Sequence, residues 1–153
     1  MIPTTDVLLT TDEEQQFKNK TYKITFLDGK GLTNGTQIRR EVSVKPKEEY
    51  RIDGYIDGLD SVAQAAFLIL STERFEYIIY SWDYGIEMVD LYGKDMPYVM
   101  SELPRRIKES LMTDNRITDV SDFEFEQNGH KLATTFTITT NVGEILGNVE
   151  VAI

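Results

Sequence analysis

Residues 117–153 read ITDVSDFEFEQNGHKLATTFTITTNVGEILGNVEVAI, and polar and apolar side chains alternate over most of this stretch. Alternation with period two is the pattern of a strand that buries one face. Turn residues divide the stretch twice, and the pair Asn128-Gly129 supplies the positive φ that a tight hairpin turn needs. The sequence therefore predicts a three-stranded antiparallel meander over residues 117–126, 131–140 and 144–153, with its second turn at 141–143.

Two segments before the meander have the pattern of helices. Ser61 and Gln64 have the spacing of a capping box, and the residues that follow are apolar on nearly every side, which is typical of a helix inside a core. Asp95 can cap a second helix, with one apolar stripe at intervals of four residues. The stripe consists of Val99, Leu103, Ile107 and Leu111. Pro104 interrupts this helix, so we expect a kink there or two short helices that meet at Leu103.

The first half of the chain contains further strand patterns. Residues 22–26 alternate, a Gly- and Asn-rich stretch follows, and residues 37–45 form a second run, which together predict a hairpin. Residues 74–82, RFEYIIYSW, are aromatic and β-branched, which predicts a strand covered on both faces or nearly so. Residues 1–20 have little periodicity and are interpreted as an N-terminal arm.

These elements predict an α+β fold in which two main helices pack on an antiparallel sheet. The chain has 153 residues, of which 41% are hydrophobic, so a single domain over residues 21–153 can bury its core without a disulfide or a metal. The absence of cysteine excludes thiolate chemistry and suits a reducing cytoplasm. The formal charge of −10 disfavours nucleic acid and anionic membranes as partners. Neither a signal peptide nor a membrane-spanning run is recognisable.

Residues able to do chemistry are few. The single histidine, His130, lies beside the predicted hairpin turn, where we expect a surface position and no metal. Glu102 and Glu109 could share a helix face as the carboxylate pair of a glycoside hydrolase, although such pairs are usually the solvated side of a helix. We therefore predict no catalytic residue, no metal and no cofactor.

Aromatic residues concentrate around the segment 74–82. Core packing of a strand explains those inside the segment, while a sugar platform and a protein interface are the alternatives. Trp82 and Tyr84 are our candidates for contact with a partner. The concentration comprises these two residues together with Tyr77, Tyr80, Tyr92 and Tyr98.

Four short motifs occur here in the order found in one family of phage proteins. They are Ser71-Thr72-Glu73-Arg74, Trp82-Asp83-Tyr84-Gly85, Ile107-Lys108-Glu109 and Asp114-Asn115-Arg116-Ile117. With them, residues 22–151 resemble the XkdS-like baseplate proteins of contractile phage tails and tail-like bacteriocins, which are relatives of the baseplate wedge sheath initiator. The likeness is strongest over residues 59–125.

The resemblance implies a contact with the baseplate wedge. Relatives carry Glu-Pro-Arg where this chain has Asp114, Asn115 and Arg116, and in them the motif is implicated in fastening the protein to the helical core bundle of the wedge. A guanidinium can bind a carboxylate or helix-end carbonyls in a fixed orientation. The alternative is that Arg116 merely pairs with Asp114 or Asp119 at the surface.

The resemblance also implies that a sheet of this protein is extended by strands from the first sheath ring. The run ILGNVEVAI, residues 145–153, could provide the free edge, with Val149 and Val151 at the contact. The expected function is thus a structural wedge component that templates the sheath, assembled in the bacterial cytoplasm and located in the baseplate. The expected partners are wedge and sheath proteins, with tube or hub proteins as further candidates. The alternatives are a lysozyme-like glycoside hydrolase of the tail and a sugar-binding module.

Overall fold

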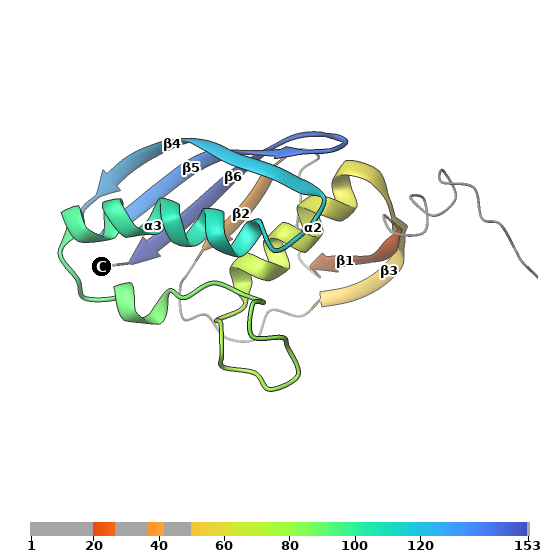
Figure 1. The fold of residues 1–153 in the computed structure, drawn as a ribbon, viewed down its shortest axis with the longest axis horizontal. Helices are drawn as coiled ribbons and strands as arrows, with labels where there is room; N and C mark the ends of the chain where they lie inside the picture. The colour runs from red at the N-terminus through yellow and green to blue at the C-terminus, as the bar shows by residue number, and fades with distance from the viewer. Residues whose placement is uncertain (1–19, 27–36, 42–49, 153) are drawn as a thin grey trace, which may run out of the picture.

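The computed structural model describes residues 20–26, 37–41 and 50–152, and the greater part of the expected N-terminal arm lies outside them. The described part contains two α-helices, a 3-10 helix and six strands (Figure 1). In chain order they are β1 (Thr21–Phe26), β2 (Gln37–Glu41), β3 (Tyr50–Ile56), α2 (Gly58–Ser71), η1 (Val89–Leu91), α3 (Met96–Leu111), β4 (Ile117–Asn128), β5 (Lys131–Thr140) and β6 (Gly143–Ala152).

The main sheet has four strands in the order β2-β6-β5-β4. β4, β5 and β6 pair antiparallel in succession, which confirms the predicted meander. Asn128 faces Lys131 across the first turn, and Gly129 has a φ of 62°, as the Asn-Gly signal requires. The predicted α+β class is confirmed.

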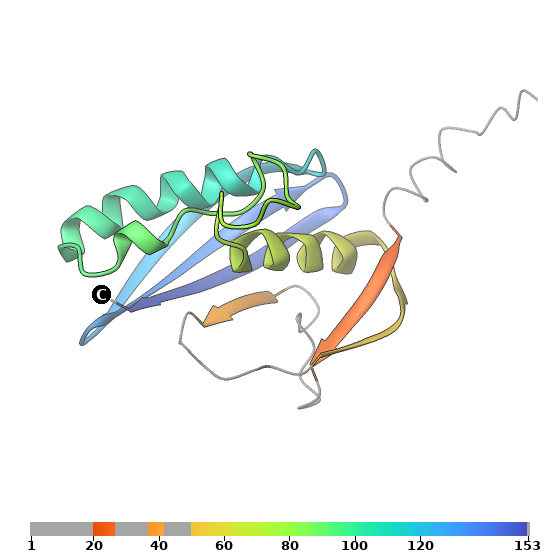
Figure 2. The same cartoon turned by 90° about the horizontal axis from the view of Figure 1, so that it is seen from below.

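Both helices lie on one face of the main sheet, as the two perpendicular views show (Figures 1 and 2). α2 packs against β2 and β6, α3 packs against β4, and the helices contact each other. The predicted stripe of α3 is fully buried, and alternate residues of β5, including Leu132, Phe136 and Ile138, face the helices. Pro104 lies inside α3, which is a single helix over its whole range, so two separate short helices do not form. Neither described helix is long and apolar enough to cross a bilayer.

The first helix begins earlier than predicted. Asp57 is the N-cap of α2, so Ser61 and Gln64 lie inside the helix, where both are buried, and the capping-box interpretation is wrong. Ser61 donates its hydroxyl to the Gly58 carbonyl. The Gln64 amide instead binds β1: its Oε1 accepts from the Ile24 N–H at 2.9 Å, and its Nε2 donates to the Tyr22 carbonyl at 2.8 Å.

The hairpin predicted over residues 22–45 is wrong. β1 pairs antiparallel with β3 in a separate two-stranded sheet, while β2 pairs in parallel with β6 at the edge of the meander. The alternation of Tyr50, Ile52 and Ile56 is the sequence signal of β3 that the prediction missed. Alternation with period two predicts a strand but not the strand that it pairs with. Here residues 37–41 pair with the edge of β6.

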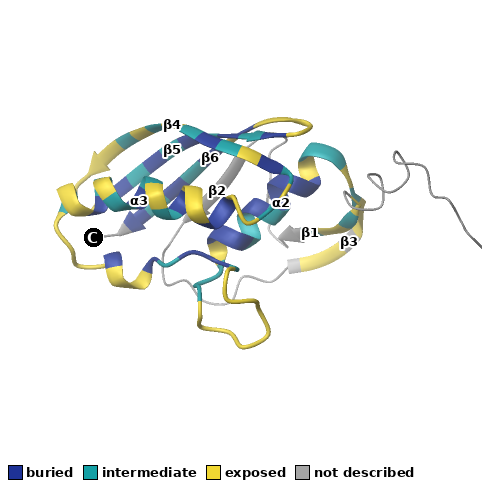
Figure 3. Ribbon diagram, in the orientation of Figure 1, coloured by how far each residue is buried: buried dark blue, intermediate teal, exposed yellow. Residues whose placement is uncertain are grey.

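Residues 74–82 do not form the predicted buried strand. The segment consists of turns and bends, and a single bridge from Glu73 to Ile86 joins the chain on either side of it. From Phe75 to Asp83 every residue is exposed (Figure 3). Aromatic and β-branched composition indicates burial somewhere, but not burial within the same chain.

Candidate partner-binding site

Residues 75–84, which we call the aromatic loop, close at their base through backbone bonds. The Arg74 N–H donates to the Ile86 carbonyl at 3.1 Å, and the Ile86 N–H donates to the Thr72 carbonyl at 2.9 Å. Gly85 allows this approach, because its φ is 98° and a Cβ there would lie 2.7 Å from the Thr72 carbonyl oxygen. The Arg74 Nε also donates to the Gly85 carbonyl at 3.1 Å.

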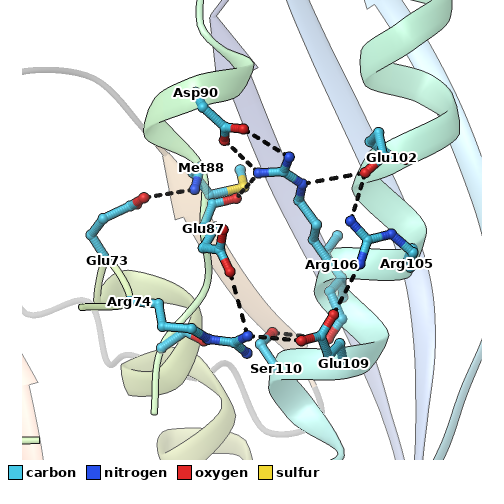
Figure 4. A network of polar contacts seen from close by, with 12 residues as sticks. Glu73, Arg74, Glu87, Met88, Asp90, Glu102, Arg105, Arg106, Glu109 and Ser110 are labelled. Atoms are coloured by element: carbon cyan, nitrogen blue, oxygen red, sulfur yellow. Dashed lines mark hydrogen bonds and ion pairs between the residues drawn. The ribbon is translucent and has the colours of Figure 1, made fainter. Parts of the chain in front are cut away.

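The pair of Arg74 with Glu109 fastens this base to α3, and Arg105 forms further pairs within the helix (Figure 4). Arg74 donates to Glu109 on α3 at 2.8 Å, and Arg105 donates to Glu109 at 3.0 Å and to Glu102 at 2.7 Å. The hydrogen bond from Arg74 lowers the pKa of Glu109, and that from Arg105 lowers the pKa of Glu102. Both carboxyls are thus held ionised at neutral pH.

A second set of contacts fixes the chain that follows the loop. Arg106 of α3 donates to the Glu87 carbonyl at 2.9 Å and binds both carboxylate oxygens of Asp90, with Nη2 2.9 Å from Oδ2. The backbone N–H groups of Met88 and Val89 donate to the Glu73 carboxylate at 2.9 and 3.1 Å. The bond from Arg106 holds the pKa of Asp90 below its usual range. Side-chain bonds to α3 therefore hold the chain both before and after the loop.

The outer part of the aromatic loop carries apolar side chains into solvent. Ile78, Ile79 and Trp82 are exposed to 102%, 85% and 79% of their reference areas, so the prediction that this segment packs in the core is wrong. Three ring contacts give the loop its shape. They are Phe75–Trp82 at 5.7 Å, Tyr77–Tyr80 at 6.2 Å and Tyr80–Tyr84 at 4.6 Å between ring centroids.

The Asp114-Asn115-Arg116 motif forms a corner between α3 and β4. The guanidinium of Arg116 binds the Asp114 carboxylate with two bonds, Nε to Oδ1 at 2.9 Å and Nη2 to Oδ2 at 2.6 Å, and the Arg116 N–H donates to the same Oδ1 at 3.0 Å. Burial raises the pKa of Asp114, but the bonds from Arg116 outweigh it and the net pKa is lowered. Both side chains are mostly buried, so this is a built corner rather than a loose surface pair. Asp119 pairs instead with Lys108.

Thr113, which precedes the corner, lines the same hollow as three residues of the aromatic loop. Tyr84 packs half-buried against the core, and burial, Tyr80 and the charge of Asp114 raise its pKa, in that order of importance. The hollow is lined by Arg74, Ser81, Asp83, Tyr84, Glu109 and Thr113. The fold thus brings Tyr84 near Asp114 of the corner, although the two lie 30 residues apart in sequence, while the ring contact described for Trp82 is with Phe75 of its own loop.

Val149 and Val151 do not belong to this site. Both are fully buried in the core, and residues 146–150 of β6 are flanked by β5 on one side and by β2 on the other. The prediction that residues 145–153 leave a free sheet edge is therefore wrong for residues 146–150. The sequence could not reveal this, because the strand that covers β6 comes from residues 37–41, over 100 positions earlier in the chain.

The carboxylates considered for glycoside hydrolysis are paired with arginine. A glycoside hydrolase needs one carboxyl with a raised pKa to donate a proton, whereas the pKa values of Glu102 and Glu109 are both lowered. Within residues 20–26, 37–41 and 50–152, no group of three His, Asp or Glu side chains is placed to hold a metal ion. Glu102 and Glu109 therefore do not form the proton-donating pair that glycoside hydrolysis requires.

Comparison with known proteins identifies the family. The family model described as contractile injection system sheath initiator matches residues 16–143, and the chain belongs to this family. Sheath initiators are structural proteins, and this chain is a structural component of a contractile tail. It is also 32% identical over 120 residues to the phage-like element PBSX protein XkdS of Bacillus subtilis (strain 168), a match that covers 71% of this chain and 84% of that protein. The resemblance stated from the sequence is confirmed.

Proposed function

We propose that this chain joins the baseplate wedge to the first sheath ring and starts the sheath by strand addition, without catalytic turnover. Residues 21–153 act as one domain in this role, and residues 1–20 act as an arm. The chain is assembled into the baseplate in the bacterial cytoplasm. The observation that carries the proposal is the Asp114–Arg116 corner, in which the carboxylate fixes the orientation of the guanidinium. Arginine and aromatic side chains contribute strongly to protein interfaces, and Tyr84 of the aromatic loop lies near Asp114.

The wedge contact is assigned to Arg116. Its Nε and Nη2 are engaged by Asp114, while the one contact described for Nη1 is long, 3.4 Å to the Ser61 hydroxyl. Nη1 can therefore donate to a helix-end carbonyl or a carboxylate of the wedge bundle. In this arrangement Asp114 acts as a positioning residue that aims the guanidinium and lowers the entropy lost on binding.

An incorporation assay tests the wedge contact. Arg116→Ala should keep the fold but reduce recovery of the chain in purified baseplates, and Arg116→Lys should restore little because a lysine lacks the planar fork. Lys108→Ala is the matched control, since it removes an exposed cation from the pair with Asp119, 2.7 Å away. Normal incorporation of Arg116→Ala would overturn this assignment.

The sheath contact is assigned to the outer edge of β4. Strand addition requires unpaired backbone groups, and among the described residues β4 pairs only with β5. Beyond its irregularity between Ser121 and Glu124, β4 runs in regular register with β5 to the turn. Deletion of residues 147–153 is no test of this role, because it would remove buried parts of the core.

Adjacent proline substitutions separate the two edges of β4. Asn128 and Lys131 flank a two-residue turn and so bond to each other, and bonded pairs alternate along an antiparallel ladder. The N–H of Glu126 therefore faces β5, and the N–H of Gln127 faces outward. Gln127→Pro should leave thermal stability nearly unchanged and prevent sheath growth on baseplates, while Glu126→Pro should lower stability. Sheaths of normal length with a folded Gln127→Pro variant would refute the edge assignment.

A further inference from the structure

The aromatic loop is an apolar projection on a strongly acidic protein. In Figure 1 it extends away from both helices and from the sheet, and Figure 3 shows it as a continuous exposed stretch. Ile78 and Ile79, near its middle, are almost completely solvent-exposed, with Trp82 close behind. Exposed large apolar side chains that are consecutive, rather than scattered, mark an interaction site.

Folding does not explain this loop. Its outer side chains contribute almost nothing to the core, while its base is held by Arg74 through the Gly85 carbonyl and Glu109. The ring contacts of Tyr80 with Tyr77 and Tyr84 restrict the loop further. A loop that is ordered before it meets a partner loses little conformational entropy on binding.

We propose that the aromatic loop inserts Ile78 and Ile79 into an apolar groove with a basic rim on a neighbouring protein of the particle. A convex projection needs a concave acceptor, and two adjacent aliphatic side chains suit a groove between packed helices or strands. Glu76 and Asp83 flank the projection as exposed acids, so lysine or arginine at the rim would complement them. The inference rests on the proposed structural role and adds a contact that neither Arg116 nor the β4 edge provides.

Two other occupants fit the observations less well. A lipid surface is disfavoured because the loop carries acids and the whole chain has a formal charge of −10. A second copy is disfavoured because the hollow beside the loop is lined mainly by charged and hydroxyl side chains, Arg74, Asp83 and Glu109 among them. Both remain measurable outcomes of the test below.

The test is a competition between chains for places in the baseplate. Cells that assemble the particle express wild-type and tagged variant chains at equal levels, and the ratio in purified baseplates is measured by mass spectrometry. Ile78→Ser/Ile79→Ser should be recovered on the order of 100-fold less than wild type, the loss expected when two aliphatic side chains are no longer buried. Glu76→Lys should also reduce recovery.

The matched control replaces exposed aliphatic side chains elsewhere. Val142→Ser/Leu146→Ser changes residues exposed to 46% and 44% and should be recovered at the wild-type level. Thermal melts of the purified chains check that every variant folds. Recovery of the Ile78/Ile79 variant at the wild-type level would overturn the proposal. So would flotation of the wild-type chain with phosphatidylcholine–phosphatidylglycerol vesicles that the variant does not show. A wild-type dimer in sedimentation that the variant does not form would overturn it as well.

The outcome is separable from that of the proposed function. If Arg116→Ala and Gln127→Pro block assembly while Ile78→Ser/Ile79→Ser does not, the groove contact alone fails. If the loop variant is excluded from baseplates, while Arg116→Ala is incorporated normally and baseplates with Gln127→Pro carry sheaths of normal length, the groove contact stands and the corner and edge assignments fail.

Discussion

Replacing Gly147 with alanine should destabilise the main sheet through a clash with one ring. Gly147 lies directly opposite Phe136 on the neighbouring strand, and a Cβ at this position would lie 2.4 Å from Cε2 and 2.5 Å from Cζ of that ring. Phe136 cannot tilt freely, because it is fully buried and stacks on Phe123 with a centroid distance of 5.4 Å. The ring has to shift by roughly 1 Å to restore an ordinary contact.

The expected cost follows from two opposing terms. Overpacking of a buried ring costs about 3 kcal/mol, at the upper end of the usual range, because the whole ring must move. Replacing glycine within a strand recovers about 0.5–1 kcal/mol of backbone entropy. Gly147→Ala should therefore lower the free energy of unfolding by about 2 kcal/mol and the melting temperature by roughly 4–8 °C.

A double-mutant cycle in urea unfolding tests the mechanism. Phe136→Leu removes the two ring atoms nearest to residue 147 and should itself cost about 1.5 kcal/mol. In the Gly147→Ala/Phe136→Leu variant the alanine Cβ has room, so this double variant should be about as stable as the single variant Phe136→Leu. Additive losses, or a Gly147→Ala variant as stable as wild type, would show that the ring does not set the requirement for glycine.

Three further predictions concern polar contacts. The pKa of Asp114 is lower in the folded chain than in the unfolded chain. The Asp114 carboxylate therefore contributes fully to stability above about pH 4, and this contribution is lost as the pH falls through the folded pKa. The difference in unfolding free energy between wild type and Asp114→Asn should accordingly disappear in acid. Gln64→Ala should speed exchange of the Ile24 amide more than tenfold while amides of α3 keep their protection, as hydrogen–deuterium exchange would report. Arg106→Met should lower the free energy of unfolding by only about 1–2 kcal/mol, because Asp90, the carboxylate partner of Arg106, is largely exposed. The same variant should be cleaved faster by proteases in the aromatic loop, and unchanged cleavage would contradict the anchoring role of Arg106.

Local patterns were enough to predict the elements that pack within one continuous stretch. The meander follows from period-two alternation and one Asn-Gly turn, and the stripe of α3 follows from apolar residues at intervals of four. Pro104 did not divide α3, since the buried stripe continues on both sides of it. In these elements sequence neighbours are also spatial neighbours, so local reasoning suffices.

Long-range pairing was not predictable in the same way. Residues 37–41 are compatible with several open edges, and the choice of β6 depends on a strand more than 100 residues away. The N-terminal start of α2 was misjudged because Ser61 and Gln64 match a capping pattern, although Gln64 serves as a partner for β1. Identical side chains can serve a helix end or a tertiary contact, and only the fold distinguishes them.

The candidate site was partly predictable. Asp114 and Arg116 were chosen from a family motif, and Trp82 from its aromatic surroundings, whereas Ile78 and Ile79 were assigned to a buried strand. Hydrophobicity reports a need for an apolar environment and does not say which molecule provides it. The arginine network under the loop, including Arg106, carries no recognisable sequence signal because its members are distributed over residues 73–109.

The two bonds from Gln64 have a consequence for how the domain comes apart. One amide side chain occupies the place that a third strand would take beside β1, and an isolated pair of strands is only marginally stable in water. Breaking those two bonds frees β1 from α2 and leaves every backbone bond of the helix intact. On gentle warming, the contact between β1 and α2 should be lost first, while the four-stranded sheet that packs against the helices stays folded.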